Sequence, residues 1–243
     1  MKEKLNRQSI VQGLVVLLIA VTLKLYYSTA SADELRWILA PTTVLVELIS
    51  GTAFTFEAHA GYLSSDRSFL IAPACAGVNF LITAFLMLMA SKLLKEHSAG
   101  KIWRFIPVAA LIAYLVTLVA NTVRIALALP LRQVPDMYWL NPDQLHRVEG
   151  IVVYFSFLLL LYVVSETISA GKSAKLLQQS LLPLLIYYAV TVGIPLANGG
   201  YRQGVSFWEH SAFVFVIPLL LLLPVALFGW QWKRRGSETE ANV

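Results

Sequence analysis

Three residues of chemically reactive types stand beside long apolar stretches of the chain: Cys75, Arg124 and His146. Cys75 is the only cysteine, so it cannot form an internal disulfide. A thiolate attacks a peptide or ester carbonyl readily near neutral pH. The attack places negative charge on the carbonyl oxygen, which a fixed cation such as Arg124 stabilises, while His146 can carry a proton to the leaving amine. These residue types together predict one acyl-transfer step.

The position of Cys75 favours this chemistry over the commoner alternative, in which a lone cysteine is a small buried hydrophobic residue. Cys75 follows the proline-broken segment Ile71-Ala-Pro-Ala74 and precedes a long apolar run. A helix beginning there places the thiol at its N-terminus, where backbone N–H groups and the helix dipole favour an anion.

Two asparagines are candidates for supporting roles. Asn121 lies one helical turn before Arg124 on the same face, so it could orient the guanidinium or donate to the oxyanion. Asn79 lies one turn after Cys75 and could support the thiol in the same way. Packing between membrane helices explains either asparagine equally well.

Glu149, three residues after His146, could hold the imidazole in one tautomer, although surface glutamates are common. Two further histidines, His59 and His210, are also expected on the outer side, and either could carry the proton in place of His146. There is no His-x-x-x-His, cysteine cluster or glycine-rich phosphate loop, so we predict neither a metal nor a cofactor.

Composition places the chain in a lipid bilayer. Apolar residues make up 58% of the 243 residues and charged residues only 14%, against about 25% charged in soluble domains. The net charge of +5 comes from short basic clusters between apolar runs, which is typical of topology determinants and not of nucleic-acid binding. The first run lacks a small-residue cleavage site and is interpreted as an anchor. We expect a single integral membrane domain over residues 1–243.

Runs of about 20 apolar residues are needed to cross the hydrocarbon core as helices. The chain therefore predicts an all-α polytopic protein with about six transmembrane helices: Ser9–Tyr27, Ala76–Leu94, Trp103–Val123, His146–Ile168, Leu181–Ala197 and Ser211–Trp232. A shorter run, Trp37–Phe54, contains Glu47, which is costly at the bilayer centre, and is predicted to be an interfacial or re-entrant helix on the outer face. The segment Thr55–Ala74 suits a small outer hairpin.

Orientation follows from the lysines and arginines of the short loops, which concentrate on the cytoplasmic side. Basic residues precede the first run and follow the second, fourth and last: Lys2, Lys4, Arg7, Lys92, Lys95, Lys101, Arg104, Lys172, Lys175, Lys233, Arg234 and Arg235. This pattern predicts cytoplasmic N- and C-termini. It also brings Cys75, Arg124 and His146 to one level at the outer face.

The motifs around these residues resemble the exosortase/archaeosortase family. Ala74-Cys-Ala-Gly77 is followed by Asn121-Thr-Val-Arg124 and then by His146 before an apolar helix, an order similar to the family's core over roughly Ser50–Ser165. Ala76 stands where many members carry serine, and longer members have more crossings. Both departures suggest a short, divergent subgroup such as exosortase K and leave the recognised sorting motif open.

The resemblance implies a multi-pass inner-membrane cysteine transpeptidase whose active site faces the periplasm or exterior. It implies that Cys75 is the nucleophile, with Arg124 and His146 as its partners. The implied substrates are surface proteins with a short C-terminal sorting motif, one transmembrane helix and a basic tail. Such a protein would be cut near the outer membrane face and joined to an unknown acceptor nucleophile.

Two other functions remain compatible with the sequence. A small transporter or lipid-handling channel would also keep Arg124, Glu47 and Asn121 in the membrane region, but it needs polar groups that continue to the cytoplasmic side. The inner halves of the helices are apolar apart from Glu166. A non-catalytic subunit of an envelope assembly system would tolerate Cys75→Ala.

Overall fold

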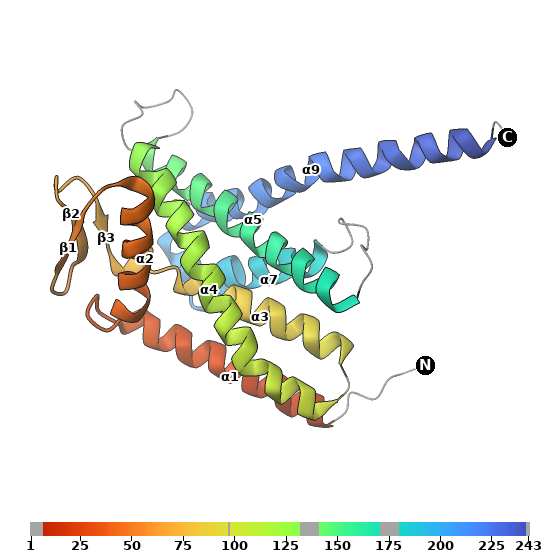
Figure 1. Cartoon of the computed structure of the whole chain (residues 1–243), viewed down its shortest axis with the longest axis horizontal. Coiled ribbons are helices and arrows are strands. Elements are labelled where there is room, and N and C mark those ends of the chain that lie inside the picture. The colour runs from red at the N-terminus through yellow and green to blue at the C-terminus, as the bar shows by residue number, and fades with distance from the viewer. Residues whose placement is uncertain (1–6, 97, 132–140, 171–179, 242–243) are drawn as a thin grey trace. The chain divides into compact units, whose positions relative to one another are not determined.

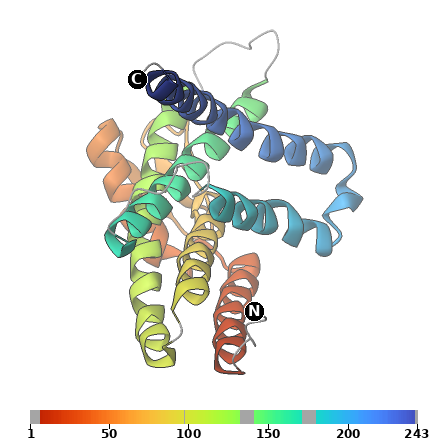
Figure 2. The same ribbon diagram turned by 90° about the vertical axis from the view of Figure 1, so that its right-hand side faces the viewer.

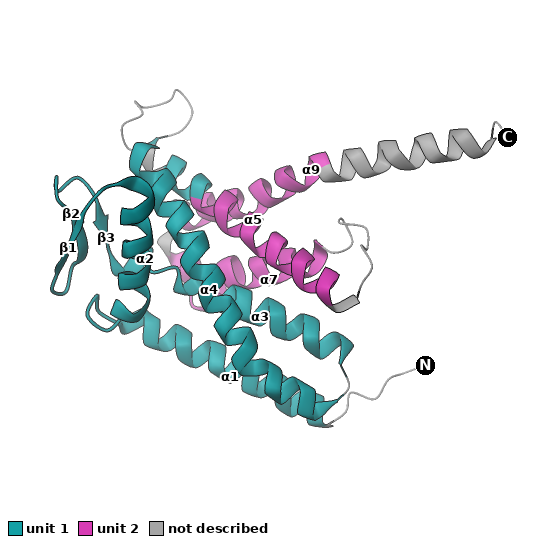
Figure 3. Ribbon diagram, viewed as in Figure 1, with its two compact units in different colours: residues 1–149 teal, residues 150–243 magenta. Residues whose placement is uncertain are grey.

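Helices follow the apolar runs of the sequence, because in lipid every backbone N–H and C=O must be satisfied within the chain. The computed structural model describes residues 7–96, 98–131, 141–170 and 180–241 (Figure 1). The described chain divides into two compact units, residues 1–149 and 150–243 (Figure 3), and each is considered by itself. The predicted topology determinants Lys2, Lys4, Lys172 and Lys175 lie outside the described residues.

Within these described ranges, five helices are long and apolar enough to cross a membrane. Their candidate spans are Gln8–Thr29 in α1 (Arg7–Thr29), Pro73–Lys95 including α3 (Val78–Lys95), Ala99–Leu131 forming α4, Gln144–Ile168 in α5 (Pro142–Ala170), and Val205–Pro224 in α9 (Val205–Ala241). This confirms the predicted class of all-α polytopic membrane protein.

The remaining predicted crossing, Leu181–Ala197, is a shorter apolar helix. It consists of α7 (Leu181–Tyr188), a π-helical turn η2 (Ala189–Gly193) and α8 (Ile194–Ala197) in continuous succession. At about 1.5 Å per residue it measures about 25 Å, less than the hydrocarbon core of about 30 Å. By length, this segment is therefore distinct from the other five.

In the first unit, α3 is the central helix, packed between α1 and α4 (Figure 1). Protein buries 72% of its membrane-spanning window, against 17% for α1 and 28% for α4. The apolar faces of α1 and α4 that remain uncovered suit contact with lipid. Because α3 packs against both α1 and α4, the residues at its start have a neighbouring helix on each side.

The run predicted at Trp37–Phe54 forms α2 (Arg36–Ser50), which is about 22 Å long and too short to cross the core unaided. Trp37 stacks on Tyr114 of α4 with ring centroids 5.8 Å apart, and the Tyr114 hydroxyl donates to the Trp37 carbonyl at 2.8 Å. Glu47 accepts the Phe54 N–H at 2.7 Å, so this carboxylate holds the exit from α2.

The hairpin that the sequence predicted within Thr55–Ala74 is present, and it begins one residue earlier, at Phe54. Strands β1 (Phe54–Glu57) and β2 (Gly61–Ser64) pair antiparallel, with Phe54 opposite Ser64 and Glu57 opposite Gly61. A short third strand, β3 (Leu70–Ile71), adds to the other edge of β2 and leads towards Cys75 (Figure 1).

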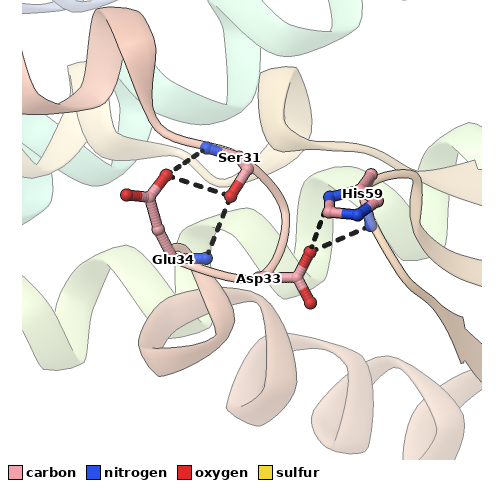
Figure 4. Close-up of polar contacts among 4 residues, drawn as sticks. All are labelled: Ser31, Asp33, Glu34 and His59. Carbon is pink, nitrogen blue, oxygen red and sulfur yellow. Dashed lines mark hydrogen bonds and ion pairs between the residues drawn. The ribbon is translucent and has the colours of Figure 1, made fainter.

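The hairpin turn is tied to the connection between α1 and α2 (Figure 4). The Ser31 N–H and hydroxyl donate to Glu34 Oε2 at 2.8 and 3.0 Å, and the Glu34 N–H donates back to Ser31 Oγ at 3.4 Å. This reciprocal pair resembles a capping box. Asp33 Oδ2 accepts the His59 N–H at 3.0 Å and lies 3.2 Å from His59 Nδ1. His59 therefore serves as a hairpin anchor here.

The second unit is built around aromatic contacts among α5, α7 and α9. Phe155 and Tyr187 meet edge to face at 5.6 Å, and the Tyr188 hydroxyl donates to the Phe215 carbonyl at 2.8 Å. Figure 2 shows α7 and the first part of α9 side by side, joined through α8 and the 3₁₀ turn η3 (Gly200–Gln203).

Candidate active site

Cys75 lies at the end of a 3₁₀ turn, η1 (Pro73–Cys75), directly before α3. Proline suits the first position of this turn because its missing N–H is not needed there. The Cys75 N–H donates to the Ala72 carbonyl at 2.8 Å, and the residue is half-buried. The helix was expected to begin at the cysteine, but α3 begins at Val78. Cys75 thus precedes the helix N-terminus and does not belong to its first turn.

Gly77 makes the change of direction between this turn and α3. Its φ of +73° is left-handed, a conformation that residues with a Cβ adopt only at a cost. A Cβ at this position would lie 3.2 Å from Asn121 Cγ and 3.2 Å from Thr117 Cγ2 on α4. Glycine therefore allows the cysteine turn to approach α4 closely.

Asn121 joins the cysteine turn to the arginine. Its side chain is fully buried, and its Nδ2 donates to the Cys75 carbonyl at 2.6 Å. Its Oδ1 accepts a hydrogen bond from an Arg124 terminal nitrogen at 3.4 Å. The same amide thus holds the backbone of Cys75 and one terminal nitrogen of the Arg124 guanidinium.

The second arm of Arg124 contacts His146. The other terminal nitrogen of the guanidinium lies 2.9 Å from His146 Nε2. A guanidinium only donates hydrogen bonds, so Nε2 accepts and the ring proton of a neutral His146 stands on Nδ1. Nδ1 lies 3.2 Å from Glu149 Oε2. Arginine and glutamate together select one tautomer of the imidazole.

Glu149 is a buried carboxylate with 6% of its side chain exposed. Within the described residues, neither of its oxygens has a hydrogen-bond partner of good geometry, although Oε2 contacts His146 Nδ1 at ion-pair distance. A buried carboxylate is costly unless an opposite charge offsets it. The contact with His146 Nδ1 is therefore the one that ties this carboxylate to the described part of the chain, and it fixes the orientation of the imidazole.

These contacts bring five of the six predicted site residues into one chain: Cys75, Asn121, Arg124, His146 and Glu149. The sixth, Asn79, points elsewhere, because its Oδ1 accepts from Lys24 Nζ on α1 at 2.7 Å. The expected one-turn relation between Cys75 and Asn79 does not apply, since Cys75 lies outside α3.

The two alternative histidines lie in other surroundings. The hairpin turn holds His59 against Asp33, and His210 lies on α9 in the second unit. Among the described residues, no group of three His, Cys, Asp or Glu side chains is placed to hold a metal ion.

Residues 6–163 match the model of the transmembrane exosortase family. The match covers more than half of the chain and includes all five residues of the contact chain. This chain belongs to the transmembrane exosortase family. The resemblance seen in the motifs is thereby confirmed, and the matched segment reaches further towards the N-terminus than the predicted core Ser50–Ser165.

Membership gives this exosortase-family protein a multi-pass membrane location and a general protease or transpeptidase role. Neither a search of curated proteins nor a search of solved structures found a match. The sequence analysis did not single out Lys24, which contacts Asn79 at the start of α3. A lysine within a membrane-spanning run is unusual, and its position in Gln8–Thr29 could have indicated a functional role.

Proposed function

We propose that this exosortase-family protein cleaves the C-terminal sorting tail of membrane-anchored proteins through a thioester on Cys75. The observation that carries the proposal is the unbroken chain of contacts from the Cys75 carbonyl through Asn121, Arg124 and His146 to Glu149. It supplies a nucleophile, a fixed cation and an oriented proton carrier, which are the three requirements of acyl transfer.

In the first half-reaction, the Cys75 thiol proton passes to His146 Nε2 and the sulfur attacks the scissile carbonyl carbon. A C–S bond forms and the carbonyl oxygen becomes an oxyanion, which Arg124 stabilises. The C–N bond then breaks, and the imidazolium returns its proton to the leaving amine. The tail departs with its transmembrane helix, and the acyl group remains as a thioester.

Arg124 has two successive partners in this scheme. In the resting state its N–H occupies His146 Nε2, the nitrogen that must receive the thiol proton. The developing oxyanion offers the guanidinium a charged acceptor, and charge-assisted hydrogen bonds are stronger than neutral ones. Arrival of substrate therefore draws Arg124 from the imidazole and frees Nε2. Asn121 keeps the guanidinium beside the cysteine turn during the exchange.

In the second half-reaction, an acceptor nucleophile attacks the thioester carbonyl while His146 takes its proton. The new bond to the acceptor forms, the C–S bond breaks, and the proton returns to the Cys75 sulfur. An amine or hydroxyl acceptor gives transpeptidation or ester transfer, whereas water gives hydrolysis. Glu149 stabilises the imidazolium in both halves.

We further propose that residues 1–243 act as one integral membrane unit of the inner membrane, with the site on the extracytoplasmic side and both termini in the cytoplasm. Support comes from the basic loops, which alternate with the apolar runs. A substrate with one transmembrane helix and a basic tail then presents its outer juxtamembrane segment at the level of Cys75.

The test is co-expression with N-terminally tagged reporters that carry a candidate sorting motif, one transmembrane helix and a basic tail. The wild-type chain should shorten the reporter on a gel, while Cys75→Ala, Arg124→Ala and His146→Ala should leave it at full length with normal expression. His59→Ala is the matched control and should process normally, because His59 is held in the hairpin turn. The mass of an adduct on Cys75 would locate the cut.

Two results would overturn the proposal. Reporters that stay at full length in the wild type count against the enzyme class and favour the transport or assembly alternatives. Normal processing by Cys75→Ala removes the nucleophile and favours a non-catalytic subunit.

A further inference from the structure

A second cation, Lys24 of α1, contacts the residues that follow the cysteine turn, whereas Arg124 belongs to α4. Lys24 lies within the candidate membrane span Gln8–Thr29 of α1. Its ammonium donates to Asn79 Oδ1 at 2.7 Å and lies 5.6 Å from the centre of the Tyr27 ring. The Tyr27 hydroxyl donates to the Pro73 carbonyl at 3.4 Å, which ties the same part of α1 to the turn.

The charge of Lys24 is not compensated within the described part of the chain, where no carboxylate lies within 4.0 Å of its nitrogen. A neutral amide satisfies one donor but carries no opposite charge. Ionisable groups within membrane spans are costly, and they mark functional sites when they are retained. An ammonium held in this way is suited to an anionic ligand that arrives from outside the chain.

Residues of two helices form hydrogen bonds with the segment Pro73–Asn79. From α4, Asn121 holds the Cys75 carbonyl, and from α1, Lys24 holds the Asn79 side chain. Cys75 and Asn79 are four residues apart, so their Cα atoms are separated by at most about 14 Å. The Lys24 ammonium is thus attached to the same short segment that carries the thiol, and Tyr27 of the same helix contacts that segment at Pro73.

We propose that Lys24 binds a carboxylate side chain of the substrate peptide close to the scissile bond, and so contributes to substrate selection. This inference rests on the proposed function. In this scheme Arg124 stabilises the negative charge that develops on the carbonyl oxygen during the reaction. Lys24 instead binds a negative charge that the substrate already carries. A lipid phosphate is the competing ligand. The structure favours the peptide, because the ammonium contacts Asn79, four residues after Cys75, and the ring of Tyr27, whose hydroxyl donates to the Pro73 carbonyl of the cysteine turn.

The test uses the purified full-length protein and paired peptide chloromethyl ketones, identical except for Glu or Gln at one of the three positions before the ketone. The Cys75 thiolate displaces chloride from the ketone's methylene, so a C–S bond forms and the C–Cl bond breaks. The alkylation rate is followed by intact mass. We expect the Glu probe to react about tenfold faster than the Gln probe at one position.

Variants at Lys24 test whether this residue causes the difference between the alkylation rates of the Glu and Gln probes. Lys24→Met keeps the length of the side chain without the charge and should bring the Glu-to-Gln ratio to about one, while Lys24→Arg should retain the preference. Lys92→Met, which removes a lysine paired with Glu96 at 3.8 Å, is the control and should leave the ratio unchanged. A structural fault would slow both probes equally and would leave their ratio intact.

Three outcomes overturn the inference. The first is equal rates for the two probes at every position in the wild type. The second is a Glu preference that survives Lys24→Met. The third is an unchanged ratio combined with loss of bound phosphatidylglycerol from Lys24→Met in native mass spectra, which assigns the ammonium to a lipid headgroup. A preference that depends on Lys24 while all reporters stay unprocessed would count against the proposed cleavage and not against the binding of a carboxylate at Lys24.

Discussion

The guanidinium of Arg124 donates to Nε2 of His146 at 2.9 Å, and this contact determines where the imidazole carries its proton. With Nε2 accepting, the proton of the neutral ring stands on Nδ1, which faces the buried Glu149. The proposed proton carrier is thus held in one tautomer and one orientation. Its reactive nitrogen is occupied by the group proposed to stabilise the oxyanion.

Arg124→Lys should disable the site although it keeps the positive charge. The guanidinium reaches Asn121 with one terminal nitrogen and His146 with the other, and a single ammonium cannot reproduce that fork. We expect reporter processing to slow by about 10²–10³-fold, the loss typical of removing one oxyanion donor. A rate near wild type, measured by pulse-chase, would show that charge alone suffices.

Glu149→Gln should slow processing by at least about tenfold, because a neutral amide cannot offset the positive charge of the imidazolium that forms during proton transfer. Glu166→Gln is the matched control: this residue is an equally buried glutamate of α5, but it lies outside the contact chain. The proton-transfer role also predicts a changed pH–rate profile for Glu149→Gln. An unaltered profile together with a lower melting temperature would instead indicate a structural role.

Gly77→Ala should destabilise the cysteine turn. The left-handed φ costs a residue with a Cβ about 1–2 kcal/mol, and the added carbon would lie 3.2 Å from both Asn121 Cγ and Thr117 Cγ2. We expect a lower melting temperature and slower alkylation of Cys75. Gly13→Ala is the control, since a Cβ at this helical position meets nothing within 4 Å. Equal effects of the two substitutions would contradict the proposed close approach.

Cys75 should react with a membrane-impermeant maleimide in intact spheroplasts. The residue is half-buried and is the only cysteine, so a single mass shift reports its side of the membrane. In the Cys75→Ala background, Ser98→Cys in the connection before α4 should react only after permeabilisation. The reverse pattern would invert the proposed orientation.

The turn between β2 and β3 should resist acid. Hydrogen bonds from Ser64 and Ser68 lower the pKa of Asp66 from 3.8 to about 2. A carboxyl with a depressed folded pKa contributes stability above pH 3.8, and this contribution is lost as the pH falls towards 2. Exchange of the Phe69 N–H, which donates to Ser64 Oγ, should therefore stay slow to about pH 4 and rise below it. Asp66→Asn should remove this pH dependence.

Much of the fold could be predicted from the sequence, because an uninterrupted apolar stretch of sufficient length is enough to indicate a membrane-spanning helix. Five of the six predicted crossings are long helices, and the hairpin lies where the mixed segment after α2 indicated it. The sixth, Leu181–Ala197, is shorter than a full crossing, and its π-helical turn gave no signal in the apolar pattern.

The site was only partly predictable. The reactive residue types and their order were visible, and so was Asn121, because one helical turn separates it from Arg124. The direction of Asn79 was not, since it depended on where α3 begins. That boundary is set by Gly77 against α4, a contact between residues far apart in the chain.

Hydropathy, basic clusters and residue types are properties of contiguous stretches, so the sequence by itself determined the membrane class, the number of apolar runs and the candidate nucleophile, cation and proton carrier. Only the tertiary structure decided that Asn121 holds the carbonyl of a residue 46 positions away, that Arg124 occupies His146 Nε2, and that Lys24 contacts Asn79. Each of these contacts requires two helices to pack at one register, and packing is decided by all the side chains between them acting together.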